Sequence, residues 1–140
     1  MAPDKDVVRF TVSLPRELLR ELDQRIIQRG YHSRSELVRD LIREKMVADQ
    51  WAVDTADVVG VLAISYDHHE RQLLQRLTDV QHHSRVNVLC TTHVHVEHDQ
   101  GLEAIVLRGH PAEIERLCIQ IGGLRGVRTA GLTRAAHVGL

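Results

Sequence analysis

The segment from residue 93 to residue 103, HVHVEHDQGLE, concentrates side chains that bind transition metals. His93 and His95 stand two residues apart, and on a strand both imidazoles leave the same face, roughly 7 Å apart. Imidazole nitrogens bind zinc-like ions at roughly 2.0–2.1 Å, so two such rings can converge on one ion. A histidine pair is also common on exposed surfaces, and the spacing alone leaves both interpretations open.

Further histidines favour the metal interpretation. Nine of the ten histidines follow residue 52, and several are adjacent to one another. His82 and His83 end a helical pattern and would point about 100° apart, so only one of them can aim at a given site. His68 and His69 stand at the beginning of the same pattern.

The second half of the chain predicts the elements that would position these residues. Strands are expected at 58–66, 86–97, 102–109 and 127–135, with HDQG as the turn between the second and third. One helical stripe runs through Leu73, Leu74, Leu77 and Val80, and Pro111 opens another. The order βαββαβ predicts a ferredoxin-like α+β domain over residues 53–140.

The first half predicts a strand followed by two helices. VVRFTVSL, residues 7–14, alternates apolar and polar residues and is typical of a strand. Pro15 opens a helical stripe that Gly30 ends, and Ser33 with Glu36 forms a capping box before a second helix over 33–46. A lone strand leaves its backbone groups unpaired, so we expect a second copy of the chain to complete a two-stranded antiparallel ribbon.

Such a ribbon predicts contact with DNA. It fits the major groove, and its outward side chains would be Arg9, Thr11 and Ser13, which can bond base edges. Ser33 and Arg34 begin the second helix, whose free N–H groups favour a phosphate. A polar strand face in a small interaction domain is the alternative, but it leaves the unpaired strand unexplained.

This half, over residues 1–52, resembles the ribbon-helix-helix repressors through RFTVSLP and GYHSRSELVRDLIRE. With YDHHER, VQHH, THVHVEHD and LEAIVLRG added, nearly the whole chain resembles the nickel-responsive transcriptional regulators of the NikR type. The resemblance implies an ACT-like metal domain and a homotetramer on a palindromic double-stranded operator. It also implies nickel(II) ligands at His93 and His95 of one chain and His82 of a neighbouring chain.

The sequence departs from that family at Gly101, where the family has a cysteine as fourth ligand. Glycine suits the end of a tight turn with positive φ, but it supplies no thiolate. Cys90 lies three residues before His93 and would point to the opposite face. Three imidazoles with a water or a carboxylate do not impose square-planar geometry, so copper, zinc or cobalt could compete with nickel.

Composition restricts the remaining function classes. Residues 1–52 carry ten Lys+Arg against nine Asp+Glu, and residues 53–140 carry eight against ten, so any DNA contact must be a local patch. No signal or membrane segment is visible, and we expect a cytoplasmic protein without a membrane partner or a small-molecule substrate. Three hypotheses follow: a metal-responsive repressor, a DNA-binding regulator with a lost or altered metal site, and a zinc enzyme, which no further acid–base residue supports.

Overall fold

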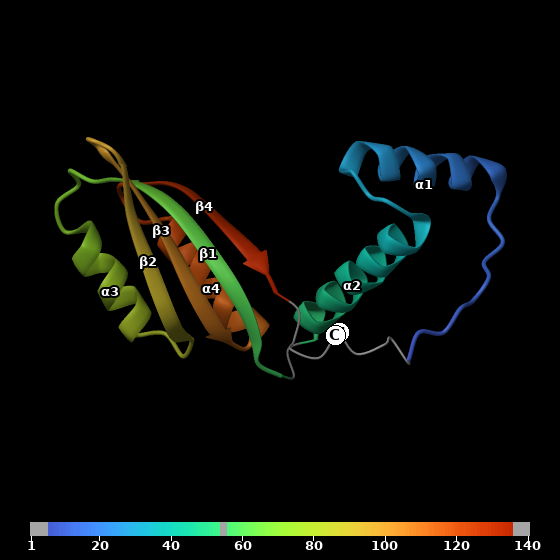
Figure 1. The fold of residues 1–140 in the computed structure, drawn as a ribbon. Helices are drawn as coiled ribbons and strands as arrows, with labels where there is room; N and C mark the ends of the chain where they lie inside the picture. The colour runs from blue at the N-terminus through green and yellow to red at the C-terminus, as the bar shows by residue number, and fades with distance from the viewer. Residues whose placement is uncertain (1–5, 54–55, 136–140) are drawn as a thin grey trace. The chain divides into compact units, whose positions relative to one another are not determined.

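The computed structural model describes residues 6–53 and 56–135 (Figure 1). The chain divides into two compact units, Met1–Leu41 and Ile42–Leu140. Helices α1 (Arg16–Arg29) and α2 (Arg34–Ala52) come first, and the remaining elements build one sheet with two helices. None of the helices among the described residues has the length and apolarity needed to cross a bilayer.

The first unit shows the expected helix signals. Gly30 adopts φ 72° and ends α1 as a left-handed cap, and its N–H donates to the carbonyls of Ile26 and Ile27. The Ser33 hydroxyl accepts a hydrogen bond from Glu36 N at 3.1 Å, and the Glu36 carboxylate accepts one from His32 N at 2.9 Å. The predicted capping box is therefore confirmed, in a form that reaches one residue further back.

Helix α2 is longer than the sequence pattern predicts. The apolar stripe indicated an end near Met46, whereas the helix continues to Ala52. Trp51 explains the difference, because only 6% of its surface is exposed and it packs into the core of the second unit. Burial of a large aromatic side chain continues a helix that its local polar sequence would leave to fray.

The second unit contains a four-stranded antiparallel sheet in the order β2-β3-β1-β4. The strands are β1 (Val58–Asp67), β2 (Asn87–Glu97), β3 (Gln100–Gly109) and β4 (Val127–Arg134). Helices α3 (Leu73–His82) and α4 (Pro111–Gly122) connect them. This order confirms the predicted ferredoxin-like α+β arrangement.

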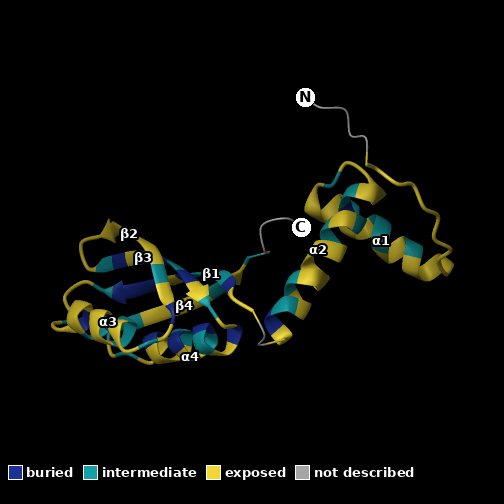
Figure 2. Ribbon diagram, turned by 90° about the horizontal axis from the view of Figure 1, so that it is seen from below, coloured by how far each residue is buried: buried dark blue, intermediate teal, exposed yellow. Residues whose placement is uncertain are grey.

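The core lies between one face of the sheet and the two helices. Leu62 and Ile64 of β1 and Ile105 and Leu107 of β3 are at most 1% exposed and belong to one cluster with apolar residues of α3 and α4. Alternation puts the next residues on the other face, where Leu102, Val94 and Val96 remain 39–52% exposed. Much of β2 is exposed in Figure 2.

Candidate functional site

The histidine pair of the predicted metal site lies on the core-facing side of β2. His93 pairs with Glu103 and His95 pairs with Gly101 across to β3. Since directly paired residues share a face, both imidazoles project on the same side as the buried Ile105. Their ring centroids lie 5.4 Å apart. The strand thus brings the two predicted ligands together, as the two-residue spacing indicated.

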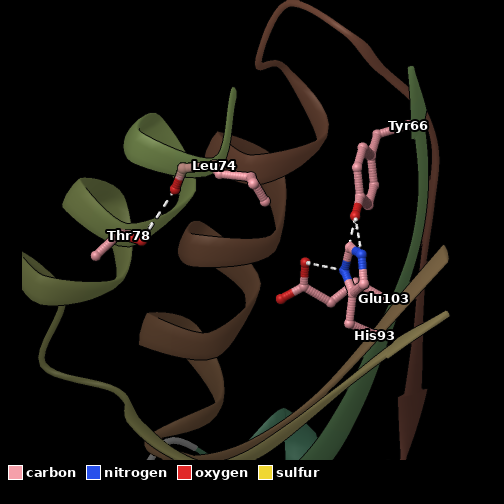
Figure 3. Close-up of polar contacts among 5 residues, drawn as sticks. All are labelled: Tyr66, Leu74, Thr78, His93 and Glu103. Carbon is pink, nitrogen blue, oxygen red and sulfur yellow. Dashed lines mark hydrogen bonds and ion pairs between the residues drawn. The ribbon is translucent and has the colours of Figure 1, made fainter. Parts of the chain in front are cut away.

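Tyr66 contacts this pair and was not singled out from the sequence. Its hydroxyl oxygen lies 2.7 Å from His93 Nδ1 and 3.2 Å from His93 Nε2 (Figure 3). The tyrosine is 1% exposed, and its pKa is raised by burial first and by Glu103 second. The group therefore stays a neutral phenol in the metal-free chain.

Glu103 approaches the same imidazole from the strand opposite. Its carboxylate lies 3.9 Å from His93 Nδ1, and the residue is 8% exposed. Burial raises the pKa of Glu103, and the neighbouring His93 lowers it in part. Figure 3 shows Tyr66 and Glu103 both directed at His93, so this ring is held on two sides.

His68 joins the pair from the other side. Its ring centroid lies 4.2 Å from that of His95 in an edge-on arrangement. The backbone N–H of His68 donates to the backbone carbonyl of Asp99 at 2.9 Å, which fixes the segment after β1 against the β2–β3 turn. The pKa of His68 is lowered by desolvation first and then by the nearby His95, His69 and His93. Sequence spacing could not reveal this contact, because it depends on how β1 pairs with β3.

Gly101 has a different structural reason from the one predicted. The turn consists of His98 and Asp99 alone, and Gly101 is the second residue of β3. Its φ is not positive, unlike that of Gly30 and Gly126. A Cβ at this position would lie 2.5 Å from Tyr66 Cζ and 2.7 Å from the Tyr66 hydroxyl oxygen. The residue is glycine because the tyrosine ring lies directly over it.

His82, the third predicted ligand, does not join the pair within one chain. It is the exposed last residue of α3. Its neighbour His83 is engaged locally, because its Nδ1 donates to the Asp79 carbonyl at 2.7 Å. Among the described residues of this single chain, no group of three or more His, Cys, Asp or Glu side chains is placed to hold a metal.

The donor types fit a borderline divalent metal, and they do not fit a thiolate site. Two imidazoles on one face are typical ligands of nickel, copper and zinc. Cys90 is paired with Val106 and so lies on the opposite face, as expected. Cys118 is half-buried, and burial first, with Glu115 second, raises its pKa to about 11. Neither thiol supplies the sulfur that Gly101 lacks.

The predicted base-reading residues lie in an extended segment before α1. Residues 7–15 have no assigned secondary structure and are exposed throughout (Figure 2). Arg9, Thr11 and Ser13 alternate there with Val8, Phe10 and Val12, whose exposed fractions are 85%, 69% and 58%. A strand is assigned only when it pairs, and this single chain offers the segment no partner strand among its described residues.

The predicted phosphate contact at the start of α2 is partly engaged. The guanidinium of Arg34 makes two hydrogen bonds to the Asp23 carboxylate, at 2.9 and 3.0 Å. The hydrogen bonds raise the pKa of Arg34 and lower that of Asp23. The Ser33 hydroxyl caps the helix. Both side chains therefore fix the end of α2 in the free chain.

Two family models match the chain. The model described as the NikR C-terminal nickel-binding domain matches residues 59–135, and the model of the ribbon-helix-helix proteins of the CopG family matches residues 8–47. Together they span both units.

Curated relatives extend over nearly the whole chain. A protein of Helicobacter acinonychis named as a nickel-responsive regulator is 56% identical over 136 residues, covering 95% of this chain and 92% of its own. One of Helicobacter hepaticus with the same name is 50% identical over 137 residues, covering 94% and 96%. Among solved structures, a homoserine dehydrogenase from Thiobacillus denitrificans matches with TM-score 0.50 at 11% identity, over 61% of this chain and 19% of that one, which concerns the fold alone.

Proposed function

This chain belongs to the nickel-responsive regulator family, and from that premise we propose that it is a metal-responsive transcriptional regulator that binds operator DNA. The observation that carries the proposal is the combination of two features in one chain. An exposed segment of alternating polar and apolar residues precedes two helices, and a same-face histidine pair lies on β2 of the other unit. Residues 1–52 would form the DNA-binding domain and 53–140 the metal-binding domain.

The DNA-binding part requires two copies of the chain. A row of apolar side chains is exposed to water in the single chain, at Val8, Phe10 and Val12. Such a contiguous apolar surface is unfavourable in water and is typical of an interface. Pairing the segment with its copy would cover this row against the helices and turn Arg9, Thr11 and Ser13 outward into a major groove. The N-terminus of α2, at Ser33 and Arg34, would contact the phosphate backbone through its free N–H groups.

Assembly beyond the dimer is supported by the uncovered face of the sheet. Leu102 of β3 and Val94 and Val96 of β2 are 39–52% exposed and form an apolar surface that the described residues of the second unit leave open. Contact between sheets of different subunits would bury it and give the homotetramer.

The metal would be held by His93 and His95 together with the neighbour's His82. A bound ion supplies coordination bonds that join two subunits, and it thereby favours the assembly in which both ribbons engage one operator. Nickel(II) is the ion that the family name supports, with copper, zinc or cobalt as competitors because a thiolate is absent. The protein would act in the cytoplasm by binding and not by catalysis.

Operator binding with and without metal tests the proposal. Duplexes selected from a random pool by the nickel-loaded chain would be titrated, using fluorescence anisotropy, with metal-free protein and with protein loaded with each ion. We expect the cognate ion to change the DNA affinity by about 5–150-fold, the usual range of coupling between sites. The double variant His93→Ala/His95→Ala should lose that change while it keeps its basal DNA binding.

The ribbon is tested with single side chains. Arg9→Ala should weaken selected-site binding and relax its base preference by on the order of 1–3 kcal/mol. Arg116→Ala is the matched control, since it removes an exposed arginine that pairs with Glu113 in the second unit. Equal effects of the two substitutions would show that Arg9 acts only through its charge. A metal-loaded protein without any duplex preference would refute the regulator itself.

A further inference from the structure

We propose that the side-chain oxygen of Tyr66 takes the place of the absent thiolate as a donor at the His93/His95 metal site. The inference rests on the proposed metal-responsive function and deepens it by naming the donor at the position that Gly101 cannot serve. It concerns this chain's own residues and makes the site one of nitrogen and oxygen donors.

The first support is the space over Gly101. Tyr66 of β1 and His95 of β2 are the two cross-strand partners of Gly101, so all three positions lie side by side on one face of the sheet. A Cβ on Gly101 would overlap the tyrosine ring, and the hydroxyl oxygen is 2.7 Å from that Cβ position. The oxygen therefore occupies the volume from which a side chain at 101 would reach the histidines.

The second support is the distance between donor atoms. Two ligands with metal bonds of about 2.0–2.2 Å lie roughly 2.8–3.6 Å apart, depending on the angle between the bonds. The Tyr66 oxygen is 3.2 Å from His93 Nε2, which is within that range. The same oxygen is 2.7 Å from His93 Nδ1, which is a hydrogen-bond distance. In the metal-free chain the phenol is therefore hydrogen-bonded to the imidazole beside which it would bind the ion.

Two other side chains, those of Glu103 and His68, also lie near the histidine pair. The Glu103 carboxylate is 3.9 Å from His93 Nδ1 and lies beside the ring, where it orients a coordinating imidazole. His68 packs edge-on against His95, and its backbone N–H donates to the Asp99 carbonyl in the β2–β3 turn. The three atoms nearest to a Cβ at position 101 all belong to Tyr66.

A phenolate oxygen in place of a thiolate sulfur is a harder donor. A bound ion would be held by the Tyr66 oxygen as phenolate, and the phenol would give its proton to solvent, one for each ion. No group is oxidised or reduced. A phenolate does not favour square-planar nickel as a thiolate does, and it leaves the ordinary affinity order, with copper strongest, to decide the selectivity.

Copper(II) is the most direct probe, because a coordinated phenolate gives it a visible charge-transfer band and enhanced ring modes in resonance Raman spectra. The full-length chain would be loaded with copper(II), and we expect both signals. Tyr66→Phe should abolish them while keeping the ring that covers Gly101. The chain contains two tyrosines, so Tyr31→Phe, which removes a hydroxyl bonded to Asp40 in the first unit, is the matched control and should keep them.

Gly101→Ala is a second, independent perturbation, since its Cβ would push the hydroxyl away from His93 without removing it. We expect the phenolate signals to fall there too, although both tyrosines remain. Copper affinity alone would not suffice, because loss of an orienting contact also weakens metal binding by about 10–100-fold.

The outcomes separate the two proposals. Copper bound through His93 and His95 without a phenolate signal would overturn the role of Tyr66 and leave the metal-responsive regulator standing. A phenolate signal that persists in Tyr66→Phe would do the same. If neither copper, nickel, zinc nor cobalt binds in a way that depends on His93 and His95, both proposals fail.

Discussion

Gly101→Cys is the substitution that restores the family's thiolate, and the structure predicts its cost. The new Cβ would lie 2.5 Å from Tyr66 Cζ and 2.7 Å from Cε2, so the ring must move. Tyr66 is 1% exposed, and its displacement strains the core. Overpacking costs about 1–3 kcal/mol, and the lost hydrogen bond to His93 about 0.5–1.5 kcal/mol.

The contacts involve the far end of a rotatable side chain, which favours the lower part of both ranges, about 2 kcal/mol in all. For a domain of this size that corresponds to a fall in melting temperature of roughly 8–16 °C. Urea unfolding of the metal-free protein, followed by Trp51 fluorescence, would measure the loss of free energy of unfolding. Trp51 is the chain's single tryptophan and lies in the second unit's core.

Gly131→Cys is the matched control, because a Cβ there meets nothing within 4 Å. It should cost less than about 0.5 kcal/mol, the usual effect of a surface substitution. In a Tyr66→Ala background the cost of Gly101→Cys should shrink by at least about 1 kcal/mol, since the ring that it strikes has gone. An undiminished cost in that background would refute the assignment of Gly101 to the space under Tyr66. With nickel, the variant should gain a thiolate charge-transfer band that the wild type lacks.

Three further predictions follow from the site and the sheet. Mixing His82→Ala chains with His93→Ala/His95→Ala chains should restore part of the metal binding in mixed assemblies, as measured by metal content after gel filtration; no recovery would place all ligands in one chain. Cys90, on the exposed sheet face, should react with thiol reagents faster as the protein is diluted and the subunits separate. Cys118, whose burial raises its pKa to about 11, should stay unreactive at pH 8. Cys90 labelling that does not depend on protein concentration would argue against a sheet-to-sheet interface. Metal occupancy should fall on acidification, because imidazole binds a metal only when neutral, and tight binding that persists in acid would indicate carboxylate ligands instead.

Local signals in the sequence were sufficient for most of the fold. Gly30 ends α1 and Ser33 caps α2 through short-range hydrogen bonds, which the capping box and the glycine predict directly. The strands of the second unit follow from runs of apolar residues, and their order from the rule for split βαβ units. Helix α2 was misjudged only where its end depends on Trp51, whose burial is a tertiary contact.

The site was predictable only as far as one strand extends. The spacing of His93 and His95 fixes their common face, and the same alternation puts Cys90 on the other. Tyr66 and His68 reach the pair from β1 and the segment after it, through a register between distant strands that no local pattern encodes. Gly101 is an example. The sequence suggested a glycine required by a tight turn, whereas in the structure a side chain at 101 would overlap the Tyr66 ring of another strand.

A metal site shared between subunits would make metal binding and assembly depend on each other. Among the described residues, His68 is the further imidazole in ring contact with the pair, and His82 lies at the exposed end of α3. If a neighbour's His82 completes the site, an isolated subunit binds the ion weakly, and the free energy by which assembly tightens metal binding equals that by which the metal tightens assembly. A donor supplied from within the chain, as Tyr66 would be, raises the metal affinity of the separated subunit and of the assembly alike, so the coupling measures the contribution of the neighbour's His82. Replacing Gly101 by cysteine should therefore change the metal affinity more than it changes the coupling, because it exchanges one in-chain donor for another while the contribution of the neighbour stays the same.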